Sequence, residues 1–140
     1  MRKLLIVSLM IAFAGMAKAQ STKPFAGKIN NEEFQVWLEI DFYNNGISVP
    51  GQAIFGKLPG FLGSKRDGRK WLITDAEVSN NAAMISIIND YGSEDLTATL
   101  TYKADGSYVL EQKSGSTIKI VVNRKWVKLP KKLKFIKVDK

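Results

Sequence analysis

Two pairs of carboxylates come closest to a catalytic pattern in this sequence. Glu39 and Asp41 alternate along one predicted strand, as do Asp75 and Glu77 along another. Residues two apart on a strand lie about 7 Å apart on the same face, a separation that glycosidases use for their two carboxyl groups. One of the two must also be buried, so that its pKa rises. Each pair shares its face with other polar residues, so we expect ordinary solvated carboxylates.

Other catalytic chemistry is limited by composition, because the chain has no histidine and no cysteine. Without them there is no Ser-His-Asp triad, no cysteine nucleophile and no conventional zinc or copper site. Ser64 and Ser114 each have a lysine neighbour, but a solvated lysine on a turn keeps its proton and cannot act as a base. Residues 60–65 lack the spacing of a phosphate loop, and no segment has the ligand spacing of an EF-hand. We therefore predict a non-catalytic protein without a metal or cofactor.

Two aromatic residues suggest a binding surface. Trp37 and Tyr43 lie on the outward face of the predicted strand 33–43, on either side of Glu39 and Asp41. A flat apolar ring beside hydrogen-bond acceptors suits a sugar. The alternative is that Trp37 packs beneath a loop or a terminus, since large aromatic side chains are usually mostly buried.

A second candidate lies in residues 58–69, which contain four glycine or proline residues and are predicted to form the longest loop. Phe61 and Leu62 stand between Gly60 and Gly63, so they could form a mobile flap at the mouth of a barrel. The alternative is a loop folded onto the core. Together, Trp37, Tyr43, Phe61 and Leu62 are the predicted ligand-binding residues.

The C-terminal end is strongly basic. Residues 119–140 hold nine lysine and arginine residues against one acid, Asp139. This charge suggests an anionic partner such as lipopolysaccharide, anionic lipid, an acidic polysaccharide or a protein, with Lys132, Lys134 and Lys137 as its contact surface. Alternatively, these lysines are the outer face of a final strand and discourage edge-to-edge aggregation. Export disfavours nucleic acid as a partner.

The N-terminus has the organisation of an export signal. Arg2 and Lys3 precede an apolar run at 4–14, and Ala17 and Ala19 supply small residues for cleavage after Ala19. The run is about eleven residues, too short for a membrane-spanning helix of about 20. We therefore expect a signal peptide at 1–19 and a periplasmic or extracellular protein without a transmembrane anchor. Its 18 basic and 13 acidic residues give a net charge of +5.

Hydrophobic alternation predicts that residues 20–140 form one antiparallel β domain with a basic C-terminal strand. In residues 33–43 the apolar side chains alternate with polar ones without a break. A strand from Ile47, interrupted at Pro50 and Gly51, should continue over 52–57. Further strands are predicted at 25–29, 70–78, 82–89, 96–103, 107–113, 117–124 and 132–138. Eight or nine strands in meander order favour an up-and-down barrel over a two-sheet sandwich, since closure removes the sheet edges.

Three segments carry a resemblance to known proteins. The strand Phe25–Ile29, the strand ending at residues 49–56, and Lys125–Trp126 followed by 134–136 resemble small secreted β proteins of unknown function that are abundant in Bacteroidetes. Such proteins form a lipocalin-like or avidin-like meander, so the resemblance implies a barrel but no activity. Where these proteins have an aromatic pair and a glycine, this sequence has Ile54 with Phe55 and Arg124.

Two hypotheses of function remain. The first is a binding module for a small molecule or glycan. The second is an envelope-associated protein that binds an anionic polymer or a protein through its basic C-terminal surface. The sequence does not indicate an oligomeric state. In either case Phe135 should be buried if residues 132–138 form the closing strand.

Overall fold

The computed structural model describes residues 23–138. The predicted signal peptide at 1–19, the cleavage site after Ala19 and the last two residues lie outside the described residues. Within the described part, no helix has the length and apolar character needed to cross a membrane.

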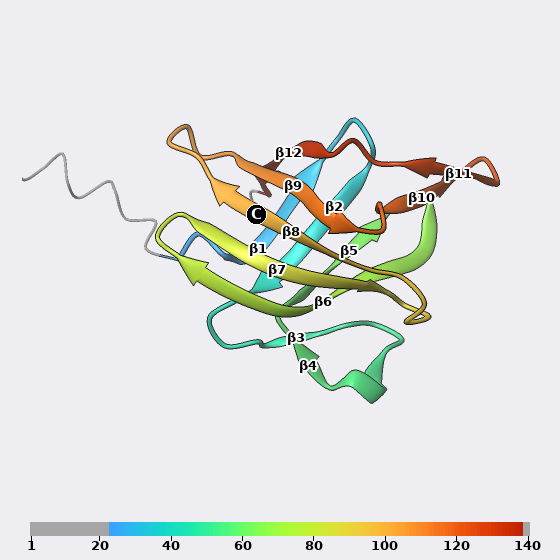
Figure 1. The fold of residues 1–140 in the computed structure, drawn as a ribbon, viewed down its shortest axis with the longest axis horizontal. Coiled ribbons are helices and arrows are strands. Elements are labelled where there is room, and N and C mark those ends of the chain that lie inside the picture. The colour runs from blue at the N-terminus through green and yellow to red at the C-terminus, as the bar shows by residue number, and fades with distance from the viewer. Residues whose placement is uncertain (1–22, 139–140) are drawn as a thin grey trace, which may run out of the picture.

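The described chain forms a closed antiparallel barrel of eight strands (Figure 1), as the alternation predicts. Each barrel strand pairs with the barrel strand that comes next along the chain, and the first pairs with the last, which closes the barrel. The strands are β1 (Ala26–Asn31), β2 (Val36–Asp41), β5 (Gly60–Ser64), β6 (Asp67–Ser79), β7 (Ala82–Asn89), β8 (Asp95–Tyr102), β9 (Tyr108–Gly115) and β12 (Lys132–Lys137).

Two excursions interrupt this meander. The first holds β3 (Ile47–Ser48), a 3-10 turn (Ala53–Phe55) and β4 (Lys57–Leu58), where we predicted one longer strand. The second is the β10–β11 hairpin, with β10 at Lys119–Val122 and β11 at Lys125–Lys128. The sequence predicted β10 as a barrel strand and did not predict β11. In Figure 1 the first excursion lies against the side of the barrel, and the second projects from one end.

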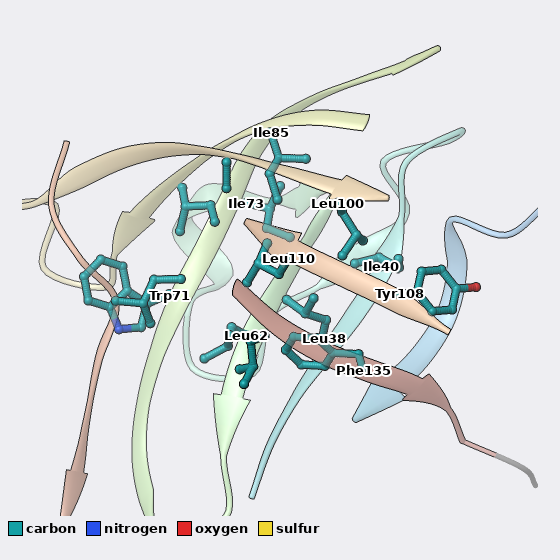
Figure 2. Close-up of a cluster of buried hydrophobic side chains, with 14 of the residues drawn as sticks. Leu38, Ile40, Leu62, Trp71, Ile73, Ile85, Leu100, Tyr108, Leu110 and Phe135 are labelled. Atoms are coloured by element: carbon teal, nitrogen blue, oxygen red, sulfur yellow. The ribbon is translucent and has the colours of Figure 1, made fainter. Parts of the chain in front are cut away.

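Apolar side chains fill the barrel interior. All eight barrel strands contribute to one cluster of buried residues, in which Leu38, Ile73, Leu100 and Phe135 are at most 1% exposed. Figure 2 shows this cluster running from Trp71 at one end of the barrel to Tyr108 at the other. Eight-stranded barrels are narrow enough for side chains to occupy the interior. Space for a ligand is therefore expected at an end of the barrel or on its outer surface.

The end near Tyr108 is closed by the segment that leads into β1. Phe25 is fully buried and stacks on Phe42, with 5.6 Å between ring centroids. The Tyr108 hydroxyl donates a hydrogen bond to the Pro24 carbonyl. Burial, together with the nearby Tyr102 and Tyr43, raises the pKa of Tyr108 to about 12, so this hydroxyl keeps its proton.

The prediction of a long loop at residues 58–69 is wrong. Gly60–Ser64 is the barrel strand β5, and all five residues are buried. Its glycines allow close packing: a Cβ on Gly60 would lie 2.4 Å from the Glu39 carbonyl oxygen, and one on Gly63 would lie 2.5 Å from the Trp37 ring. Phe61 points away from the interior into a second apolar cluster with Val49 and Leu72, beneath the first excursion. This cover buries both faces of β5.

The C-terminal segment is the closing strand, as predicted. In β12 the buried Leu133 and Phe135 alternate with the exposed Lys132 and Lys134. Lys137 is exposed as well, and its Nζ donates to the Ala26 carbonyl oxygen over 3.1 Å. Strand β12 pairs with β9 on one side and β1 on the other, so it completes the ring of hydrogen bonds.

Replacing Phe135 with alanine should lower the free energy of unfolding by about 3 to 5 kcal/mol, because the fully buried ring leaves a cavity in the core. Ile136→Ala is the matched control, since Ile136 lies on the same strand and is 50% exposed. Urea unfolding followed by tryptophan fluorescence measures both. Equal unfolding midpoints for the two variants would show that β12 is not part of the cooperative barrel.

Candidate functional site

A cavity of about 330 Å³ opens at the end of the barrel opposite Tyr108. It lies between the adjoining ends of β5 and β6, the end of β7 with the β7–β8 turn, and the β10–β11 hairpin, which supply its lining. Turns of a barrel lie at its mouth, where small ligands commonly bind. We call this the end cavity.

The end cavity has an apolar floor and an aromatic rim. Leu62, Trp71 and Ile120 line it from below and are at most 5% exposed. At the rim, Tyr91 is 78% exposed and Trp126 is 58% exposed. An exposed apolar surface beside a hollow is a common feature of ligand-binding sites. The cavity therefore offers flat apolar surfaces to a ligand of small size.

The buried Gln112 of β9 fixes the base of the second excursion. Its Nε2 donates to the Pro130 carbonyl oxygen over 3.1 Å, and its Oε1 accepts from the Ile118 backbone amide over 2.8 Å. The Leu129 amide also donates to the Ile118 carbonyl. One side chain thus bonds the entry and the exit of the excursion, and a buried amide is stable there because both of its ends are satisfied.

Two further contacts bind β10 to the barrel. The Trp71 indole Nε1 donates to the Lys119 carbonyl oxygen over 3.1 Å. The Lys119 ammonium contacts both carboxylate oxygens of Glu94, at 3.0 and 3.2 Å. Glu94 belongs to the β7–β8 turn, which Asn89 holds by accepting from the Ser93 and Glu94 amides. The walls of the cavity are therefore fixed to one another as well as to the barrel.

Arg69 stands at the cavity edge between an acid and an aromatic ring. Its Nη1 lies 2.8 and 2.9 Å from the two carboxylate oxygens of Asp67, and its guanidinium carbon lies 5.2 Å from the centre of the Trp126 ring. Burial opposes ionisation of Asp67, but hydrogen bonds and the charge of Arg69 outweigh it and lower the pKa of Asp67. Hydrogen bonding to Asp67 in turn raises the pKa of Arg69. Both groups are charged at neutral pH.

Charges around the end cavity are balanced. Its lining holds three cations, Arg69, Lys70 and Lys119, and three acids, Asp67, Asp90 and Glu94. Four of these six form the two ion pairs described above, and Asp90 accepts from the Lys70 backbone amide over 3.0 Å. A balanced rim favours an uncharged ligand moiety with hydroxyl groups, because each polar group can donate or accept without leaving a net charge.

The structure separates the four residues predicted to bind a ligand. Trp37 and Phe61 lie together on the outside of the barrel, with ring centroids 6.3 Å apart, whereas Leu62 points inward and lines the end cavity. Tyr43 is six residues from Trp37, roughly 20 Å along an extended strand. Its hydroxyl accepts from the Phe25 amide at the other end of the barrel.

Phe61 is buried and Trp37 is half-buried. Phe61 is 2% exposed, so the mobile-flap prediction for it and Leu62 is wrong. The Trp37 ring contacts Phe61 and the backbone at Gly63, and the Lys28 ammonium lies 5.0 Å from its centre. A hollow of about 340 Å³ lies beside it. Its Nε1 is buried and has no hydrogen-bond partner in the described part of the chain.

None of the four carboxylates in the two predicted pairs lines the end cavity. Asp75 and Glu77 are exposed on β6, and Asp41 Oδ1 accepts from the Asn44 amide in the turn after β2. Within residues 23–138, no group of three or more acidic side chains is placed to hold a metal ion.

Sequence reasoning missed the aromatic rim. Trp126 comes from β11 and Tyr91 from the β7–β8 turn, and Trp71 in the floor comes from β6, so their convergence depends on the closed barrel. One local signal was present: Trp126 follows Arg124 and Lys125 and precedes Lys128 in a short strand, a highly charged setting for such a large ring.

No known protein family, curated protein or solved structure matches this chain in sequence or fold.

Proposed function

We propose that this protein is a non-catalytic binding module that holds a glycan or a similar small molecule in the end cavity. The observation that carries the proposal is the grouping of Trp71, Tyr91 and Trp126 around a cavity of about 330 Å³ with a polar, charge-balanced rim. Pyranose rings present a flat apolar face and a border of hydroxyl groups. A stacking surface surrounded by donors and acceptors suits that shape.

The barrel is a suitable scaffold for such a site. Eight-stranded antiparallel barrels include ligand carriers such as lipocalins and streptavidin. Here the interior is occupied by side chains, which favours a ligand at the mouth over one deep inside. The resemblance to secreted lipocalin-like proteins and the predicted export signal fit a protein that meets glycans outside the cytoplasm.

Replacing Trp126 with alanine should weaken saccharide binding by at least about tenfold, since losing an aromatic anchor commonly costs about 2 kcal/mol or more. Candidate ligands come from a thermal-shift screen of oligosaccharides, and calorimetry then gives the affinities. Phe55→Ala is the control, because Phe55 is also an exposed aromatic residue, 41% accessible, but lies in the first excursion. Equal affinities for Trp126→Ala and the unchanged protein would contradict the proposal.

A second candidate function uses the basic C-terminal surface. Lys132, Lys134 and Lys137 are all exposed on β12, and neighbouring Lys128 and Lys131 are exposed as well. A row of lysines on a rigid strand would attract an anionic polymer or membrane through long-range charge, with little dependence on the shape of the partner. Such binding would weaken with salt, since the Debye length falls to about 8 Å at 0.15 M.

Changing Lys132, Lys134 and Lys137 together to glutamine should reduce sedimentation with phosphatidylglycerol vesicles at low salt. Stability should change little, since all three side chains are exposed. The control, Lys57→Gln/Lys65→Gln/Lys103→Gln, removes the same charge from exposed lysines elsewhere. Equal sedimentation of the two triple variants would exclude a specific role for β12.

A further inference from the structure

Arginine is distributed unevenly in this protein. The chain has four arginines among its 21 basic residues, and the first is Arg2, outside the described residues. The other three, Arg66, Arg69 and Arg124, all line one open depression beside the end cavity. The fourteen described lysines, in contrast, are scattered over the surface and none lines this depression. Arginine is suited to oxyanions because its planar fork donates two parallel hydrogen bonds, which a lysine cannot do.

The three arginines come from two elements that the fold brings together. Arg66 and Arg69 belong to the β5–β6 turn and its following strand, and Arg124 lies at the tip of the β10–β11 hairpin. At that tip, Asn123 and Arg124 have φ of 53° and 67°. Positive φ at both central residues is the geometry of a type I′ turn, in which glycine at the second position is less strained. The hairpin has an arginine at that position.

The positive charge of this arginine cluster is only partly compensated by acidic residues. Arg69 pairs with Asp67, which is the only acid lining the depression, whereas Arg66 and Arg124 form no ion pair with any described residue. The lining therefore carries a net charge of +2. Nη1 of Arg69 bonds the Asp67 carboxylate, and Tyr91 also interacts with this guanidinium. The uncompensated charge of the cluster therefore belongs to Arg66 and Arg124.

The depression and the end cavity share one wall. Asp67, Arg69, Val121 and Trp126 line both. A ring stacked at Trp126 would thus hold any substituent on its outer edge next to the arginines. The two hollows differ in charge, because the end cavity is balanced and the depression is positive.

We infer that Arg66, Arg69 and Arg124 form an oxyanion subsite, so that the ligand is an acidic saccharide whose carboxylate or sulfate lies against the arginines. The inference rests on the proposed function for its saccharide part. The anion subsite itself can be tested without any sugar.

The first arm titrates the protein with sodium sulfate and follows the arginine Nε–H signals by NMR. The signals of Arg66, Arg69 and Arg124 should shift and reach saturation. In the double variant Arg66→Gln/Arg124→Gln only Arg69 is left, and its signal should no longer shift with sulfate. Sodium chloride at equal ionic strength should cause no such shifts. If sulfate moves the arginine Nε–H signals no further than chloride does, the anion subsite is overturned, regardless of how the protein binds sugars.

The second arm compares cellotriose with the β-1,4-linked trisaccharide of glucuronic acid, which carries carboxylates at C6. The acidic sugar should bind about fivefold to tenfold more tightly, the gain expected from one or two charge-assisted hydrogen bonds at an exposed site. Arg66→Gln/Arg124→Gln should remove this advantage and leave cellotriose binding unchanged. Lys57→Gln/Lys103→Gln, with the same loss of charge, should retain it.

The outcomes separate the two claims. Equal affinity for both trisaccharides, each sensitive to Trp126→Ala, would overturn the acidic-ligand inference and leave the proposed function standing. A third outcome is that sulfate shifts the three arginine signals but Trp126→Ala leaves sugar affinity unchanged. That result would support the anion subsite and contradict the proposed function.

Discussion

The hydrogen bonds of Gln112 connect the barrel to the hairpin that completes the candidate site. Its amide group bonds both ends of the excursion, at Ile118 and Pro130. The excursion supplies Ile120 to the floor of the end cavity, Trp126 to the rim and Arg124 to the arginine cluster. Because Gln112 is buried, losing either bond would leave a polar group without water or a partner, which costs about 1 to 3 kcal/mol. The hairpin is thereby held over one barrel end.

The two excursions give the barrel surfaces that its eight strands alone do not provide. A closed meander has no free edges, and its narrow interior is filled, so by itself it presents only an outer surface. The first excursion covers Phe61 and Leu72 on the outside and adds a second apolar cluster. The second excursion stands at the end and encloses space between itself and two barrel turns. One excursion therefore adds burial, while the other creates a concave surface.

Most of the fold was predictable from the sequence because alternation is a local property. Strand β2 follows the pattern of Val36, Leu38 and Ile40, and β12 follows that of Leu133 and Phe135, with the apolar residues inward in both. The prediction failed at 58–69, where glycines usually mark a loop. Gly60 and Gly63 instead permit close contact with Glu39 and Trp37, and those contacts are distant in sequence.

The candidate site was less predictable than the fold. Trp71, Tyr91 and Trp126 come from a barrel strand, a turn and a hairpin, and only the closed barrel brings them together. Of the four residues predicted to bind a ligand, only Leu62 lines the end cavity, and it does so as part of the floor. Trp37 does face outward, but its ring packs against the cluster beneath the first excursion and contacts Lys28. Burial on the outside of a barrel depends on segments whose placement alternation does not reveal.

The central claim is that ligands bind at the end cavity and not at Trp37 on the side of the barrel. The chain has three tryptophans, so the indole N–H region of its ¹H–¹⁵N NMR spectrum should show one signal from each. Titration with the trisaccharide that binds more tightly should move the signals of Trp126 and Trp71 and leave that of Trp37 in place. Movement of the Trp37 signal alone, with Trp126 and Trp71 unchanged at saturation, would contradict the account.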